Sequence, residues 1–125
     1  MKLRIHGNAL RLRLNQAEVG QFSKTGWLEE VVEFAPGVSF SFALESLSSV
    51  PAPRAVYQHN ALRIQLPAAK ANHWITTDEV GIQVEQAVGN GRQLSILIEK
   101  DFQCVHSPNP DADAYPNPLQ PETRS

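Results

Sequence analysis

Asn8-Ala9-Leu10-Arg11 occurs a second time in this chain, as Asn60-Ala61-Leu62-Arg63, 52 residues later. The similarity continues on both sides at the same offset, and Gly37 corresponds to Gly89. After that glycine the offset becomes 54, because Asn90-Gly91 adds a tight turn to the second copy. Matches that persist through strand-like and helix-like segments predict an internal repeat, which decides the architecture of the chain.

Each copy of the repeat has the pattern of two strands, a helix and two further strands. In the first copy, alternation of polar and apolar residues predicts strands at 2–6 and 9–14. Asn15 and Glu18 match a capping box, and Gly26 is a fitting end for the helix that follows. The other predicted elements are strands at 27–34, 38–47, 54–58, 62–66, 79–87 and 93–102, and a second helix that Pro67 opens.

The repeat predicts a single domain at residues 1–104, made of units 1–47 and 54–102 joined by a connector at 48–53. One unit of about 50 residues is near the lower limit for independent folding. Two interleaved units would share one core and leave no open strand edge. We therefore expect a mostly β fold with two short helices, in which duplicated β-β-α-β-β units form one pseudo-twofold β-barrel. Residues 105–125 are predicted to be a proline-rich acidic tail.

The composition is typical of a soluble globular protein, with 42% hydrophobic and 19% charged residues. No segment approaches the roughly 20 apolar residues of a membrane span, so we expect no membrane association. The single cysteine excludes an internal disulfide framework and fits a reducing cytoplasm, where we expect the protein to reside. The net charge of −2 hides an uneven distribution, because the first 17 residues contain no acidic side chain.

The stretch from Leu62 to Lys70, Leu-Arg-Ile-Gln-Leu-Pro-Ala-Ala-Lys, with Asp78-Glu79-Val80 after it, resembles the AbrB/MazE swapped-hairpin domain. That family shows a strand, an apolar residue and a proline that open a short helix, and a strand that begins Asp-x-Val. The resemblance covers residues 60–100 well and 8–46 more loosely.

The AbrB/MazE resemblance implies a bacterial transition-state regulator or antitoxin in which two copies build one barrel whose basic face binds DNA. Tandem single-chain versions exist in that family, as in the MraZ regulators. The sequence departs from the family pattern at Thr77, where a glycine is usual, and at Asn15, where the first copy lacks the proline. Motifs as short as these indicate a fold rather than a function.

The chain also resembles an uncharacterised family of short bacterial proteins. These proteins open with K-L-R-I-x-G-N, here residues 2–8, and carry E-K-D-F-x-C near the end, here residues 99–104. This resemblance spans nearly the whole chain, but it implies no activity.

Five basic residues are candidate contacts for nucleic acid: Lys2, Arg4, Arg11, Arg13 and Arg63. The first four fall on one side of the predicted hairpin, because side chains two apart in a strand share a face. Arg63 corresponds to Arg11 in the second copy and suggests a two-sided contact with phosphates. The alternative is an ordinary solvated sheet face, since arginine also protects exposed strands from aggregation.

A second cluster, in the tail, contains candidate metal ligands: Asp101, Cys104, His106, Asp111 and Asp113. Cys-x-His spacing can serve one ion, and the mixed donors would suit zinc or another divalent metal. The alternative is a buried Cys104 and a solvated tail, because a lone cysteine is typically a small hydrophobic residue.

Enzyme chemistry is less expected than binding. Cys104 and His106 could act as nucleophile and base, but no oxyanion element or orienting third group is visible in the sequence. We therefore expect a small bacterial binding or regulatory module, either an AbrB-like DNA-binding regulator or an antitoxin-like protein. The alternative is a metal- or ligand-binding accessory protein that uses Cys104 and His106. DNA or a protein is the expected partner, and the chain is expected to be a monomer or a homodimer.

Overall fold

The computed structural model describes residues 1–101, which form eight strands and two helices. The elements follow one order twice, as the sequence predicts: strand, strand, helix, strand, strand. The first half contains β1 (Lys2–His6), β2 (Ala9–Leu14), α1 (Gln16–Thr25), β3 (Trp27–Ala35) and β4 (Val38–Leu47). The second half contains β5 (Arg54–Gln58), β6 (Ala61–Pro67), α2 (Ala68–Thr76), β7 (Gly81–Gly89) and β8 (Arg92–Lys100). The expectation of a mostly β fold with two short helices is confirmed.

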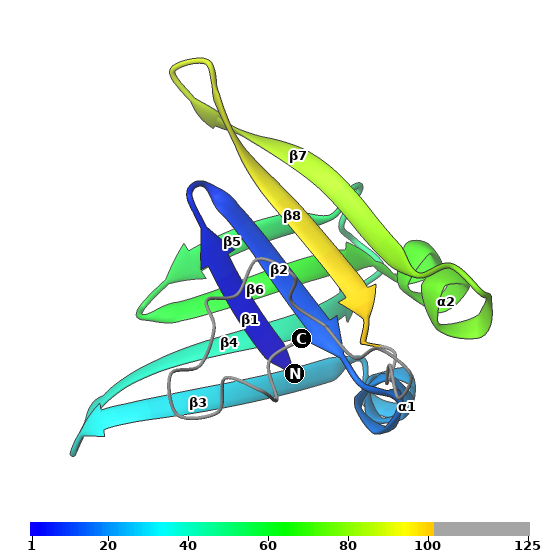
Figure 1. Ribbon diagram of the computed structural model, residues 1–125, viewed down its shortest axis with the longest axis horizontal. Coiled ribbons are helices and arrows are strands. Elements are labelled where there is room, and N and C mark those ends of the chain that lie inside the picture. The colour runs from blue at the N-terminus through cyan, green and yellow to red at the C-terminus, as the bar shows by residue number, and fades with distance from the viewer. Residues whose placement is uncertain (102–125) are drawn as a thin grey trace, which may run out of the picture.

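The strands form two four-stranded sheets, and each half of the chain contributes a hairpin to both (Figure 1). Sheet A has the order β1-β2-β8-β7, and sheet B has the order β3-β4-β6-β5. At the centre of each sheet, strands from the two halves run parallel. Leu10 lies opposite Ile96 in sheet A, and Leu62 lies opposite Phe42 in sheet B.

The two parallel strand pairs, β2–β8 and β4–β6, share the same kind of backbone contact. In sheet A the Ser95 N–H donates to the Asn8 carbonyl at 3.0 Å, and in sheet B the Ser41 N–H donates to the Asn60 carbonyl at 3.1 Å. Asn8 and Asn60 are the residues that open the repeated four-residue stretch. Corresponding residues of the two halves therefore hold corresponding positions in the two sheets.

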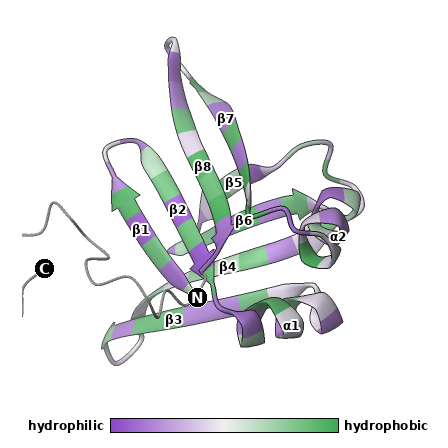
Figure 2. Cartoon of the chain, turned by 45° about the vertical axis from the view of Figure 1, so that its right-hand side comes forward, coloured by the Kyte–Doolittle hydropathy of each residue, from purple (hydrophilic) through white to green (hydrophobic). Residues whose placement is uncertain are grey.

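One hydrophobic core lies between the inner faces of the two sheets and the two helices. Alternate residues of the central strands enter it, which Figure 2 shows as alternation of hydrophobic and hydrophilic segments. Phe22 of α1 and Trp74 of α2 occupy corresponding positions and are 1% and 0% exposed. The Trp74 indole N–H donates to the Val80 carbonyl at 3.0 Å, so its polar atom is satisfied inside the core. Complete burial of such a side chain stabilises the fold by roughly 2–3 kcal/mol.

The first helix begins and ends where its local sequence predicts. The Asn15 side chain accepts from the Glu18 N–H at 2.9 Å, and the Glu18 carboxylate accepts from the Asn15 N–H at 2.9 Å. This reciprocal pair is the predicted capping box. Gly26 ends the helix with a φ of 70°, a left-handed conformation that glycine adopts without steric cost.

The expectation of one closed barrel is wrong, because the eight strands form two separate sheets. Closure would require backbone pairing of β1 with β3 and of β5 with β7, and neither pair forms in residues 1–101. The long hairpins β3–β4 and β7–β8 run away from each other (Figure 1), so side chains span these junctions instead. At the β5–β7 junction, the Gln86 side-chain amide bonds to the backbone of Ala55. At the β1–β3 junction, the α-amino group of Met1 lies 3.1 Å from a carboxylate oxygen of Glu30.

Candidate functional site

Four of the five predicted basic contacts lie together on the solvent side of sheet A, the sheet A outer face. The strand register places Lys2 opposite Arg13, and Arg4 opposite Arg11. The leucines between them point the other way into the core, because side chains alternate along a strand. The hairpin β1–β2 therefore presents four cations in two adjacent rows.

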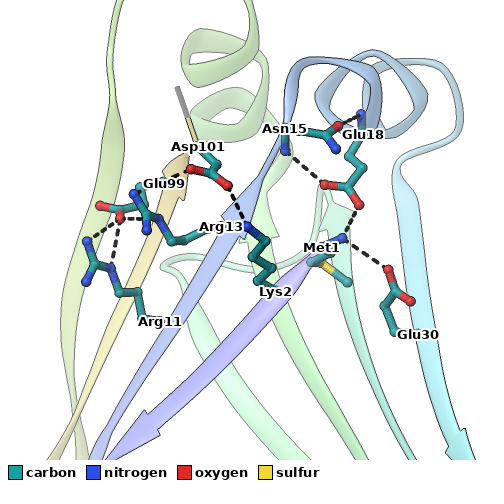
Figure 3. Close-up of polar contacts among 9 residues, drawn as sticks. All are labelled: Met1, Lys2, Arg11, Arg13, Asn15, Glu18, Glu30, Glu99 and Asp101. Carbon is teal, nitrogen blue, oxygen red and sulfur yellow. Dashed lines mark hydrogen bonds and ion pairs between the residues drawn. The ribbon is translucent and has the colours of Figure 1, made fainter. Parts of the chain in front are cut away.

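Carboxylates from β8 and the residue after it neutralise part of this cationic cluster (Figure 3). One oxygen of Glu99 accepts from Arg11 Nε at 2.8 Å and lies 3.0 Å from Arg13 Nε. Arg13 Nε makes no directed hydrogen bond, so its attraction to Glu99 is mainly ionic. Asp101 lies 3.2 Å from Lys2 Nζ and 3.5 Å from Arg13 Nη2. Three of the four cations are therefore held by carboxylates.

Next to these ion pairs the sheet A outer face is slightly hollowed. A depression of about 340 Å³ is lined by Arg4, His6, Arg11 and Gln83, with small and apolar side chains between them. Arg4 forms no ion pair within the part of the chain that the structure describes. This end of the hairpin thus carries an arginine without a carboxylate partner among the described residues, beside a histidine.

Arg63 does not join the other four basic residues. It lies on the solvent side of sheet B, because Leu62 and Ile64 on either side of it point into the core. Its guanidinium lies over the Trp27 ring, 5.9 Å from the ring centroid. A second depression, of about 400 Å³, is lined there by Arg54, His59 and Arg63 among other residues. The pseudo-symmetry therefore gives each outer face its own basic depression. Arg11 and Arg63, which were predicted to make a two-sided contact, lie on opposite outer faces.

A further charged cluster, around Met1, is not evident from the sequence. The α-amino group of Met1 forms ion pairs with the carboxylates of Glu18 and Glu30, and so joins β1, α1 and β3 (Figure 3). Burial alone would raise the pKa of Glu18, but hydrogen bonds from this amine and from the Asn15 N–H outweigh it, so the pKa is lowered. Burial would lower the pKa of the amine, but its hydrogen bonds to the two carboxylates outweigh this and raise it. The capping-box pattern was a signal for the Glu18 contact with Asn15, but no local pattern links Glu18 to Met1.

The predicted metal ligands lie mostly outside residues 1–101. The structure places Asp101 alone of the five, and this carboxylate is engaged by Lys2 and Arg13. Cys104, His106, Asp111 and Asp113 lie outside the described residues, so the metal site stays a prediction. Within residues 1–101, no three His, Cys, Asp or Glu side chains are grouped so that they could hold an ion.

Within residues 1–101 the protein is small and mostly β, with two sheets, two helices and a charged outer face on sheet A. No helix in the described part of the chain is long and apolar enough to cross a membrane. Residues 1–119 match the model of DUF7009, a family of unknown function, and the chain belongs to this family. No curated protein and no solved structure matches the chain.

Proposed function

We propose that the chain is an AbrB-like regulatory module that binds duplex DNA through the sheet A outer face. The exchange of hairpins between the two halves supports the AbrB-like assignment. In each sheet, a hairpin from one half pairs in parallel with a hairpin from the other. This arrangement is the one that the resemblance at residues 62–80 implies, with the difference that the barrel is open.

The observation that carries the DNA-binding proposal is the register of β1 with β2. It places Lys2 beside Arg13 and Arg4 beside Arg11, on a surface that solvent reaches. Cations on neighbouring strands can contact several phosphates of one duplex and release the counterions bound there.

Glu99 and Asp101 set the expected strength of this binding. Both carboxylates must exchange their arginine or lysine partners for solvent when phosphates approach, and this exchange opposes binding. We therefore expect modest affinity and a dependence on salt that is less steep than four unopposed cations would give. The same competition provides a test, because removal of a carboxylate and removal of an arginine must change DNA affinity in opposite directions.

Fluorescence anisotropy with a labelled duplex, measured over a series of salt concentrations, tests the proposal. Arg11→Gln combined with Arg13→Gln should weaken binding. The plot of log K against log salt should become less steep, with its slope reduced in magnitude by about 1–2. The control is Arg63→Gln, which removes a cation from the opposite outer face and should leave the affinity unchanged. The proposal fails if no binding occurs at low salt, or if the double variant binds as well as the original chain.

A further inference from the structure

The edge strand β3 exposes apolar side chains on both of its faces. It is the outermost strand of sheet B, so one side of its backbone is unpaired within the described residues. Val31 lies on the outer face and is 62% exposed. Phe34 lies on the opposite face of the strand, past the last residue that packs in the core, and is 69% exposed. Val32 on the core side is also exposed. Proteins normally protect such an edge, because it is a template for pairing with another strand.

The hairpin β3–β4 also carries charge of one sign. From Trp27 to Leu47 the sequence contains four glutamates and no lysine or arginine. Glu29 and Glu33 share the outer face of β3 with Val31. A strand that pairs with β3 should therefore be basic on its outer face and apolar on its inner face.

The strand β1 meets both requirements. It is the edge strand of sheet A, and its sequence Lys-Leu-Arg-Ile-His alternates cations with apolar residues. Leu3 packs at the rim of the core, but Ile5 is 62% exposed although it faces the core side. This strand is thus incompletely covered in the same way as β3.

The two strands match in register as well as in composition. Arg4 lies between Leu3 and Ile5, just as Glu33 lies between Val32 and Phe34. If Leu3 and Ile5 of β1 lie opposite the apolar pair of β3, the residues between them must also lie opposite each other. Arg4 is then opposite Glu33 in both a parallel and an antiparallel pairing. The apolar contacts and the opposite charges then stabilise the pairing on both faces.

This pairing does not form within one chain. The α-amino group of Met1 contacts Glu30 near the middle of β3, and beyond that point β1 and β3 run apart (Figure 1). The part of β3 that contains Glu33 is therefore out of reach of Arg4 in the same molecule, but it is accessible to the β1 of a second copy.

We propose that two copies of this chain associate by pairing β1 of each copy with β3 of the other. Both free edges border the same open junction, so a twofold axis can form the two pairings together, with the same surface used by each copy. Pairing through the backbone edges leaves Arg11 and Arg13 on the sheet A outer face. The inference does not rest on the DNA-binding proposal, which a monomer could also satisfy.

Charge exchange at Arg4 and Glu33 tests the proposal, with mass measured by analytical ultracentrifugation over a wide range of protein concentration. The full chain is used without an N-terminal tag, because β1 begins at the second residue. The original chain should show a monomer–dimer equilibrium. Arg4→Glu and Glu33→Arg should each weaken the dimer at least about tenfold, because like charges then face each other. The double variant that combines them should restore the dimer.

Two surface changes away from both edges serve as matched controls. Arg92→Glu at the turn of β7–β8 and Asp78→Arg before β7 alter charge by the same amounts and should leave the dimer unchanged. Circular dichroism checks that each variant is folded. A chain that stays monomeric at every concentration overturns the inference, and so does a dimer that ignores both charge reversals.

Discussion

The side chain of Gln86 binds the backbone of Ala55 as a neighbouring strand would. The Ala55 N–H donates to Gln86 Oε1 at 2.7 Å, and Gln86 Nε2 donates to the Ala55 carbonyl at 3.0 Å. The amide thus satisfies both polar groups of a partly buried residue on the edge strand β5 and ties it to β7. In the first half of the chain, Phe34 holds the position that corresponds to Gln86, and it cannot make these bonds. The two junctions between the sheets are therefore not equivalent.

Replacement of this amide should destabilise the fold without changing its shape. Gln86→Met keeps the length of the side chain but leaves the Ala55 N–H and carbonyl without their partners. We expect the free energy of unfolding to fall by about 1–3 kcal/mol, measured by urea denaturation. The control is Gln83→Met on the exposed face of the same strand, which should change the stability by less than about 0.5 kcal/mol. Equal losses in the two variants would contradict this role for Gln86.

The ion pair of Glu18 with the α-amino group of Met1 predicts a dependence of stability on pH. The pKa of Glu18 is lowered from its ordinary 4.5, so its contribution is present above that value and is lost as the pH falls through the folded pKa. The pKa of the amine is raised from 8.0, so its contribution is present below that value and is lost as the pH rises through the folded pKa. Urea denaturation of the original chain and of Glu18→Gln should therefore differ most between these limits.

Two further comparisons complete this pH experiment. Glu29→Gln removes an exposed carboxylate of β3 and should not reproduce the pH dependence of the difference. A stability difference between Glu18→Gln and the original chain that is constant from acid to alkaline pH would show that the ion pair contributes nothing.

Glu99 should restrain DNA binding if the sheet A outer face is the binding surface. Glu99→Gln releases Arg11 and Arg13 from their shared carboxylate, so DNA should bind more tightly and the salt slope should steepen by about 1–2. Anisotropy titrations measure both quantities. Glu85→Gln removes a carboxylate from the same face that binds Ser95 instead of arginine, so its effect should be smaller. Identical affinities for the two variants would count against direct use of the arginines.

The indole of Trp74 should contribute more to stability than its bulk alone. Trp74→Phe keeps a large aromatic ring but removes the indole donor to the Val80 carbonyl, which still accepts from the Lys100 N–H at 2.9 Å. It should lower the free energy of unfolding by about 0.5–1.5 kcal/mol, the net contribution of one hydrogen bond. Trp74→Ala should lower it by about 3–5 kcal/mol, because a fully buried side chain is removed. Chemical denaturation gives both values. A phenylalanine variant as stable as the original chain would show that the indole hydrogen bond adds nothing to the bond from Lys100.

The local elements of this fold follow from signals that lie within a few residues. The capping box between Asn15 and Glu18 and the left-handed Gly26 fix the first helix, and the alternation of residues 9–14 fixes a strand. The predicted closed barrel failed because closure depends on how far the long hairpins diverge, and no single segment encodes that divergence. A sequence signal did exist at Gln86, which is a polar residue on the inward side of β7 between Val84 and Val88.

The candidate site was predictable only in part for a similar reason. The shared face of the β1–β2 cations follows from strand periodicity, but the contact of Arg11 with Glu99 joins residues 88 positions apart. Parallel pairing of β2 with β8 creates this contact, and the sequence alone does not specify that pairing. Arg63 was grouped with Arg11 because the repeat relates them, although the same symmetry places them on opposite sides of the molecule.

The parallel pairing of β2 with β8 also constrains how the protein is made. Leu10 leaves the ribosome long before Ile96, its neighbour in sheet A, which is one of the last residues that the structure describes. The amino-terminal hairpin must therefore wait, with the apolar face of Leu10 and Leu12 uncovered, until nearly the whole sheet-forming chain has been synthesised. Contacts between such distant residues slow folding and prolong exposure to aggregation. The arrangement that joins the two halves thus makes completion of sheet A a late event in biosynthesis.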